Sequence, residues 1–379
     1  MMKKCKYSEL CGGCTYQGID YSEQLKLKQG KADKLLGKYH KVNPIIGMDN
    51  PLHYRNKVQV SFGYDESRHF IYGNYIPKTH QLLQIDECML CDENAYKIFE
   101  SLKRLLIKYH VSVYNERTKK GILRHAIIRT SNKGEYMLVM VCSVSRFKSM
   151  DNLVKDLIRY NPLINTIVLN VNSKPGSQVL GNRNYTLYGK GYITDSLCGL
   201  DFKISASSFY QVNKRQTEVL YNYAIDKAEL NDKDTVIDAY CGTGTIGLCA
   251  SKKVKNVLGI ELNKEAVKDA ATNKKINNIE NIEFIADDAG KYMKYLSDND
   301  KRYSAVIMDP PRSGSDMKFM NSLVKMSPDK VIYISCNPVT LADNLKYLTK
   351  FYEIKDIQPV DMFPYTEHIE TVVCMTRIK

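Results

Sequence analysis

Hydrophobic and polar residues alternate along the first half of the chain with the period of two that is typical of half-buried β-strands. Helical periodicity interrupts this pattern at residues 21–39, 93–109 and 151–159. We expect an α+β arrangement in which antiparallel strands dominate, with a hairpin turn in SNKG. The predicted strands lie in KVQVSFGY, HFIYGNY, HQLLQID, GILRHAIIRT, EYMLVMVCSV and TIVLNVN.

The second half follows another pattern, because short hydrophobic runs there alternate with helical segments from residue 211 onward. Strands that alternate with helices form a parallel, doubly wound sheet. The predicted strands lie in DTVIDAY, NVLGIEL, NIEFIAD, YSAVIMD and KVIYISC. We therefore expect a smaller α+β domain over residues 1–19 and 46–198, a basic helix within 20–45 that packs on the second domain, and a Rossmann-like α/β domain over 199–379.

Composition narrows the classes of protein that fit. The net charge of +13 suits a polyanionic partner such as RNA, although a basic proteome explains the same surplus. No run of eighteen apolar residues and no secretory signal are present, so we expect a cytoplasmic monomer without membrane contact. The 11 cysteines favour a reducing compartment over a disulfide framework.

A glycine-rich turn follows the first strand of the second domain, in DAYCGTGTIG. Gly242, Gly244 and Gly247 let the backbone approach a ligand at the start of a helix. Glu261 ends the next strand, where a carboxylate can accept hydrogen bonds from both hydroxyls of a ribose. This geometry serves NAD and S-adenosylmethionine equally well.

Acidic residues at the later strand ends separate these two cofactors. Asp287 and Asp288 follow the third strand, and Asp309 follows the fourth, just before two prolines that end the ladder. Consecutive acids at one sheet edge suit a cationic sulfonium and would repel the pyrophosphate of NAD. Helix capping explains one or two of these acids but hardly the series, so the pattern favours S-adenosylmethionine.

Cys336 ends the fifth strand, in ISCNP, and is a candidate nucleophile. A buried structural thiol is the commoner fate of a free cysteine. Here the polar context and a helix expected near Thr340 indicate a loop tip, where the helix N-terminus can lower the pKa of a thiol. A thiolate that attacks carbon 6 of uracil makes carbon 5 nucleophilic enough to take a methyl group. For the base that then removes the carbon-5 proton, the residues leave open Glu367, His368 and Glu370.

Cysteines also cluster at the start of the chain. Cys5, Cys11 and Cys14 are spaced C-x5-C-x2-C, and Cys88 or Cys91 could add a fourth ligand. The spacing fits neither a ferredoxin run nor a zinc ribbon. A [4Fe–4S] cluster, a zinc site and unrelated thiols all stay open, with a structural metal clasp preferred to a redox centre.

Together these segments resemble the bacterial RNA uracil-5 methyltransferase family over nearly the whole chain. The resemblance rests on the motifs CGGCTYQ, YRNKVQ, RHAIIR, SSFYQVN, DAYCGTGTIGL, MDPPRSG, ISCNP and FPYTEHIET. It implies methylation of a uridine in RNA, 23S rRNA ahead of tRNA, with Cys336 as nucleophile and Glu370 as base.

The resemblance also implies two cofactors. S-adenosylmethionine would contact Gln211, Tyr240, Glu261, Asp288 and Asp309. A [4Fe–4S] cluster would be held by Cys5, Cys11, Cys14 and Cys88.

Two departures from the family pattern affect these expectations. The cluster motif begins at Cys5, which leaves no room for the RNA-binding TRAM domain of many members, so basic surface such as residues 26–38 would have to grip RNA. Tyr365 and Glu367 stand where the family has His and Gly, so Glu367 could compete for the role of base.

Three rival functions were weighed. A nicotinamide-dependent iron–sulfur oxidoreductase would use the same glycine-rich turn, and a non-catalytic RNA-binding protein would account for the charge alone. Amino-group methylation of adenine needs an aromatic residue after Asp-Pro-Pro, where this chain has Arg312. None of the three accounts for Cys336 together with the aligned acids.

Overall fold

A computed structural model describes residues 4–176 and 178–378, and the chain divides into two compact units. The first comprises the segment that ends at Gly18, together with Pro51–Ser196 and Lys203–Ser207. The second comprises Ile19–Asn50, Leu197–Phe202 and the segment from Ser208 onward. Two strands, β8 (Tyr192–Leu197) and β9 (Leu200–Ser205), pair with each other where the chain passes between the units.

The first unit contains a seven-stranded sheet in the order β3-β2-β1-β4-β5-β6-β7. Most neighbours are antiparallel, as predicted, but β5 and β6 are parallel because a helix, α3, crosses between them. The predicted strand in HQLLQID shortens to β3, and β7 was not predicted. The strands are β1 (Lys57–Tyr64), β2 (Phe70–Tyr75), β3 (Leu82–Gln84), β4 (Leu123–Thr130), β5 (Tyr136–Cys142), β6 (Ile164–Val171) and β7 (Arg183–Tyr188).

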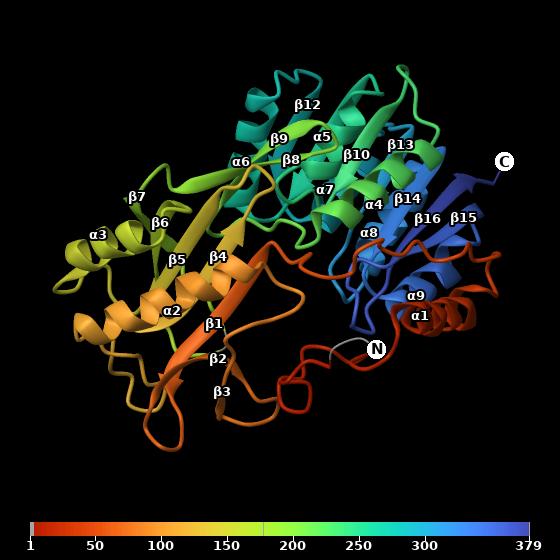
Figure 1. Ribbon diagram of the computed structural model, residues 1–379. Helices are drawn as coiled ribbons and strands as arrows, with labels where there is room; N and C mark the ends of the chain where they lie inside the picture. Colours follow the sequence, from red (N-terminus) through yellow and green to blue (C-terminus); the bar gives the residue numbers. More distant parts are fainter. Residues whose placement is uncertain (1–3, 177, 379) are drawn as a thin grey trace. The chain divides into compact units, whose positions relative to one another are not determined.

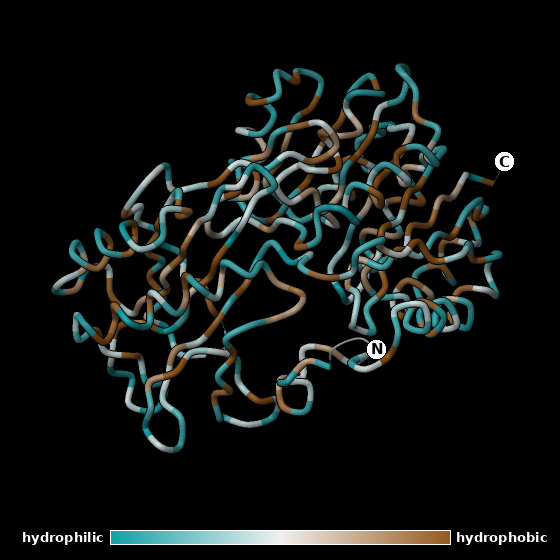
Figure 2. The backbone as a smooth tube through the Cα atoms, viewed as in Figure 1, coloured by the Kyte–Doolittle hydropathy of each residue, from teal (hydrophilic) through white to brown (hydrophobic). Residues whose placement is uncertain are grey.

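Two amphipathic helices, α2 (Glu93–Lys108) and α3 (Met150–Tyr160), cover one face of this sheet (Figure 1). Their apolar residues recur at helical spacing and join the buried strand residues in one core, whereas their outer faces are polar (Figure 2). The Asp92 side chain caps α2 by accepting a hydrogen bond from the Asn94 backbone N–H at 2.9 Å.

The second unit contains the predicted doubly wound sheet, in the order β12-β11-β10-β13-β14-β16-β15. The first five of these strands are parallel, and β16 pairs antiparallel with both β14 and β15. The strands are β10 (Thr235–Ala239), β11 (Asn256–Glu261), β12 (Ile282–Ala286), β13 (Ala305–Met308), β14 (Lys330–Ser335), β15 (Tyr352–Val360) and β16 (Glu370–Arg377).

Helices cover both faces of this sheet, as Figure 1 shows. One face packs on α1 (Tyr21–Leu36), α7 (Ala289–Asp298), α8 (Met317–Met326) and α9 (Pro338–Leu348). The other contacts α4 (Lys214–Lys227), α5 (Thr245–Ser251) and α6 (Lys264–Ile276). The helix predicted from residue 211 begins only at Lys214, because the Asn213 side chain caps it. Throughout the described residues, each helix is too short or too polar to cross a bilayer.

A buried ion pair fixes α1 to the segment between β15 and β16. Lys28 Nζ lies 2.6 Å from Asp361 Oδ1, and both side chains are fully buried. Lys28 also donates to the Phe363 carbonyl at 3.0 Å, and the Tyr21 hydroxyl donates to Asp361 Oδ2 at 2.9 Å. Lys28 was predicted to belong to a basic surface that grips RNA. Its side chain is fully buried, so this part of the prediction is wrong.

Replacing Lys28 with methionine should destabilise the protein by about 3–5 kcal/mol, because the Asp361 carboxylate would stay buried without its cation. Urea unfolding measures this loss. Lys26→Met on the same helix is the control, because Lys26 is 72% exposed and should change the free energy of unfolding by less than about 0.5 kcal/mol. Equal losses for both variants would contradict a structural role for the buried pair.

Candidate active site

Parallel strands bring the predicted site residues of the second unit to one edge of its sheet. Ala239 pairs with both Ile260 and Met308, and Glu261 pairs with Ala286, so these strands end almost level. The antiparallel β16 starts at the same edge, since Thr371 pairs with Ser335. In sheet order the edge carries Asp288, Glu261, Tyr240, Asp309, Cys336 and Glu370.

The strand order reverses between β10 and β13, and ligands of open α/β sheets bind at such a reversal. Tyr240 and Asp309 follow these two strands directly. The Tyr240 hydroxyl hydrogen-bonds Ser315 Oγ at 2.8 Å, and its ring packs at 5.4 Å from the ring of Phe319. The crevice therefore has a fixed aromatic residue on one side and a carboxylate on the other.

The glycine-rich turn has the backbone that its sequence predicts. Tyr240 and Gly244 have positive φ values of 64° and 78°, and a Cβ added to Gly244 would lie 2.6 Å from Phe284 Cζ. Asp238 is buried beneath the turn and accepts a hydrogen bond from the Gly247 N–H at 2.9 Å. Burial raises the pKa of Asp238 well above its usual range. Only glycine fits at 244, and the backbone is left free to approach a ligand.

Two of the predicted cofactor residues also stabilise their own loops. Glu261 accepts hydrogen bonds from the Gly242 and Asn263 N–H groups at 3.0 and 2.7 Å. Asp288 caps α7 through the Lys291 N–H at 2.8 Å. Capping thus accounts for part of the acidic series, and the carboxylate oxygens keep lone pairs for a ligand. Gln211 lies half-buried before α4 in the same unit.

Two neighbouring carboxyl groups dominate the electrostatics further along the edge. Burial raises the pKa of Asp309 to about 7. Burial and the charge of Asp309 together raise the pKa of Glu370 well above its usual range, and Arg312 opposes this shift. A cation placed beside these groups would favour their ionised forms, so the site suits a sulfonium cofactor.

Cys336 lies beside these carboxyl groups and is half-buried. Its pKa is raised to about 11, first by burial and then by the charges of Glu370 and Asp309, whereas Arg312 lowers it. The helix N-terminus, which can lower the pKa of a thiol, is therefore not the dominant influence on Cys336. Although α9 begins two residues later with Asn337 as its cap, desolvation and two carboxylates outweigh the helix end.

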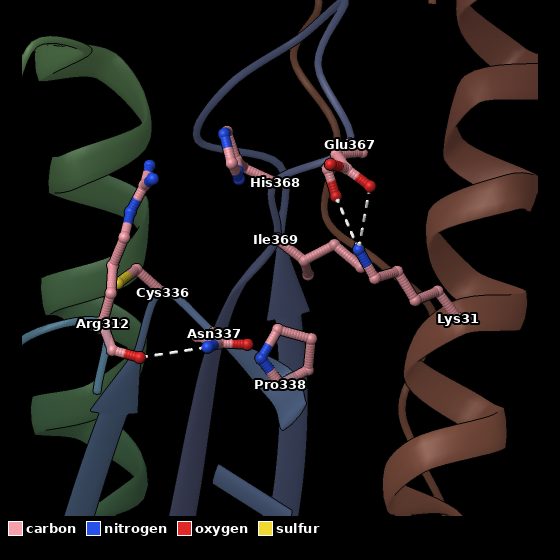
Figure 3. A pocket seen from close by; sticks show the side chains of 8 residues that line it. All are labelled: Lys31, Arg312, Cys336, Asn337, Pro338, Glu367, His368 and Ile369. Carbon is pink, nitrogen blue, oxygen red and sulfur yellow. Dashed lines mark hydrogen bonds and ion pairs between the residues drawn. The ribbon is translucent and has the colours of Figure 1, made fainter. Parts of the chain in front are cut away.

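A pocket of about 200 Å³ opens beside the Cys336 sulfur. In Figure 3 the Lys31 and Arg312 side chains flank it from opposite sides, and Glu367 and His368 lie above it. Burial and the charge of Arg312 lower the pKa of His368. The other residues that line the pocket are Asn337, Pro338 and Ile369.

The three candidate bases differ in their surroundings. Glu367 is 55% exposed and its carboxylate lies 3.5 Å from Lys31 Nζ, whereas Glu370 is buried at the start of β16. In the sequence, Arg312 is a mismatch to an adenine site and Lys31 is one of several basic residues on a helix, so neither was predicted to line the pocket. The signal for Arg312 was its place in DPPR after the fourth predicted strand. No local pattern indicates that Lys31 lines the same pocket as Cys336, which is far away in the sequence.

A second cavity lies in the first unit, at the cysteine motif. Cys5, Cys11, Cys14 and Cys88 all line it, and Cys91 does not. A hydrogen bond with the Cys91 thiol lowers the pKa of Cys88 to about 6, while burial raises that of Cys14 to about 11. Within the described ranges, no three Cys, His, Asp or Glu side chains are placed closely enough to hold a metal ion. The cluster assignment stays a prediction.

The comparisons with known proteins bear on the whole chain. The family described as tRNA (Uracil-5-)-methyltransferase matches residues 20–378. An RNA methyltransferase of Oceanobacillus iheyensis is 39% identical, covering 97% of this chain and 81% of that relative. One from Caldanaerobacter subterraneus is 40% identical, covering 99% and 84%. The structure of Pyrococcus abyssi tRNA (uracil-54, C5)-methyltransferase with S-adenosyl-L-homocysteine has a TM-score of 0.79 at 28% identity, covering 97% of this chain and 86% of that one.

A doubly wound sheet with a glycine-rich turn and an acidic carboxyl edge is the catalytic fold of an S-adenosylmethionine-dependent methyltransferase. Both of these relatives are named as RNA methyltransferases. The chain belongs to the RNA uracil-5 methyltransferase family.

Alkylation of Cys336 by iodoacetamide should rise about tenfold per pH unit from pH 7 to pH 10, because the reactive thiolate forms with a pKa of about 11. Glu370→Gln should move this profile to lower pH by removing a neighbouring negative charge, and Arg312→Gln should move it to higher pH. Mass spectrometry of the Cys336 peptide separates this thiol from the others. A wild-type rate that levels off near pH 8 would contradict the assigned environment.

Proposed function

We propose that the protein transfers a methyl group from S-adenosylmethionine to carbon 5 of a uridine in RNA through a covalent bond between Cys336 and carbon 6. The observation that carries this proposal is the common position of Cys336, Asp309 and Glu370 at one edge of the sheet, beside the strand reversal. A target base entering the pocket of about 200 Å³ meets the thiol directly. Such a base must leave its stack, so the target is a loop or single-stranded uridine.

S-adenosylmethionine supplies an electrophilic methyl group. The Gly244 turn and Glu261 would hold its ribose side, and Asp309 would face its positive charge. Once its thiol has lost its proton to solvent, the Cys336 sulfur would add to uracil carbon 6, and the electron pair would move through carbon 5 to give an enolate. Carbon 5 of the enolate would take the methyl group as the bond from that methyl to the sulfonium breaks, which leaves S-adenosylhomocysteine.

Glu370 then removes the carbon-5 proton. The electron pair released re-forms the double bond between carbon 5 and carbon 6 and expels the Cys336 sulfur as a thiolate. Burial and the nearby Asp309 charge raise the pKa of Glu370, which makes its carboxylate a stronger base than an exposed one. Glu367 has a weaker claim, because it is exposed and paired with Lys31.

Replacing the carbon-5 hydrogen by fluorine should trap the native protein on RNA, because fluorine cannot leave as a proton. A denaturing gel should show this adduct with wild type and none with Cys336→Ala. On ordinary RNA, Glu370→Gln should accumulate the same adduct and lose turnover by about 10²–10⁴-fold, the usual contribution of a general base. Glu367→Gln is the matched control and should turn over normally at saturating RNA. If Glu367→Gln accumulated the adduct and lost turnover while Glu370→Gln turned over normally, Glu367 would be the base.

The RNA itself has two candidates. The resemblance, with its cysteine motif, favours 23S rRNA, whereas the Pyrococcus abyssi structure is of an enzyme named for tRNA uracil 54. Unmodified transcripts of both RNAs, supplied together with the native protein, would show which of them gains the methyl group.

We also propose that Cys5, Cys11, Cys14 and Cys88 hold a [4Fe–4S] cluster that clasps the N-terminal segment to the rest of the first unit. Supporting this, the four thiols line one cavity and have the donor chemistry such clusters take. The pKa of Cys14 is raised first by burial and further by the charges of Cys88, Cys11 and Cys5.

Anaerobically purified protein should be brown and contain about four irons per chain, as a [4Fe–4S] cluster requires. Cys88→Ala should lose the iron and the colour. Cys91→Ala is the control and should retain both, because Cys91 does not line the cavity. One bound zinc in a colourless wild-type preparation, or equal iron loss in both variants, would overturn the assignment.

A further inference from the structure

The side chain of Lys31 is brought to the active-site pocket by a helix face that is otherwise buried. Gln24, Lys28 and Lys31 follow one another at i, i+4 and i+7, so they share one face of α1. Gln24 Oε1 accepts a hydrogen bond from the Tyr365 N–H at 2.8 Å, and Lys28 is paired with Asp361. These two contacts fix the helix against the segment before β16, so Lys31 cannot move away with its backbone.

The partner of Lys31 is by contrast weakly held. Lys31 Nζ lies 3.5 Å from Glu367 Oε2 and 3.4 Å from the Glu367 carbonyl oxygen. The two side chains are 35% and 55% exposed. Ion pairs this open to water stabilise a fold very little, so exchange of one anion for another costs little. Lys31 is thus a positioned cation with a replaceable counter-ion.

The pocket is lined by two cations, Lys31 and Arg312, and by few anions that could neutralise them. Arg312 lines the opposite side, and among the described residues that line the pocket Glu367 is the one carboxylate. Asp309 and Glu370 raise the pKa of the thiol from the sheet edge, whereas Glu367 is the carboxylate paired with Lys31 in the described part of the chain. A nucleotide that enters beside Cys336 brings phosphates on both sides of its base.

We propose that Lys31 binds a backbone phosphate next to the target uridine, and that Glu367 occupies Lys31 until RNA displaces it. Glu367 then competes with the RNA phosphate for Lys31, and this competition lowers the affinity of the protein for RNA. This inference rests on the proposed function, because it takes RNA as the substrate of the pocket.

Equilibrium binding of unmodified RNA to the full-length protein without cofactor tests the proposal, with salt varied from 50 to 200 mM. The probe is whichever transcript, 23S rRNA fragment or tRNA, wild type methylates. Lys31→Ala should weaken binding about fivefold at 0.1 M salt and reduce the slope of log K against log salt by about 0.7, the value for one single-strand phosphate. Glu367→Gln should tighten binding, because Lys31 no longer has to exchange partners.

The double variant separates displacement from a general charge effect. If Glu367 acts through Lys31, then Glu367→Gln tightens binding in wild type and has no effect in the Lys31→Ala background. Equal tightening in both backgrounds would overturn the proposal. Lys26→Ala is the control, because Lys26 is exposed on the same helix and paired with Glu23, and its slope should match wild type.

The methyl-transfer proposal and the phosphate-binding proposal predict different failures. If wild type methylates neither transcript, the proposed function fails. If wild type methylates RNA through Cys336 but Lys31→Ala keeps the wild-type slope and affinity, only the phosphate assignment fails.

Discussion

The parallel register of β12, β11, β10, β13 and β14 is the constraint on which the active site depends. Because parallel strands end at the same edge, residues far apart in the chain come together without any dedicated scaffold. β16 adds the last group by running in the opposite direction, which places the first residue of the strand, Glu370, where the other strands end. A shift of β16 by one residue would turn Glu370 to the other face of the sheet.

Desolvation is the largest cause of every raised pKa at this edge. It acts on Asp309, Cys336 and Glu370, and the charge of Asp309 reinforces it at Cys336 and Glu370. Arg312 is the cation that opposes the shifts of Cys336 and Glu370. A thiol with a pKa of about 11 is protonated at neutral pH, and a cation beside the carboxyl groups would favour their ionised forms.

Much of this site could be predicted from sequence, because each strand end is marked locally by an acid, a glycine or a proline. The alternation of strands and helices predicted a parallel sheet with a shared carboxyl edge, whereas the order of the strands came from the structure. Burial could not be read in the same way. From the sequence, a helix N-terminus could lower the pKa of Cys336, but the sequence does not show the carboxyl groups that fold next to the thiol. Lys28 was treated as surface charge because its partner, Asp361, lies 333 residues away. The parallel pairing of β5 with β6 was not predicted for a different reason, because a period of two does not encode strand direction.

The chemical identity of the product tests the central claim most directly. The native protein would be incubated with unmodified RNA and S-adenosylmethionine that carries a deuterated methyl group, and the RNA digested to nucleosides for mass spectrometry. We expect 5-methyluridine that retains the whole deuterated methyl group, and none when Cys336 is replaced by alanine. Methylated adenosine or cytidine from the wild-type protein, or 5-methyluridine from the Cys336→Ala variant, would contradict the account.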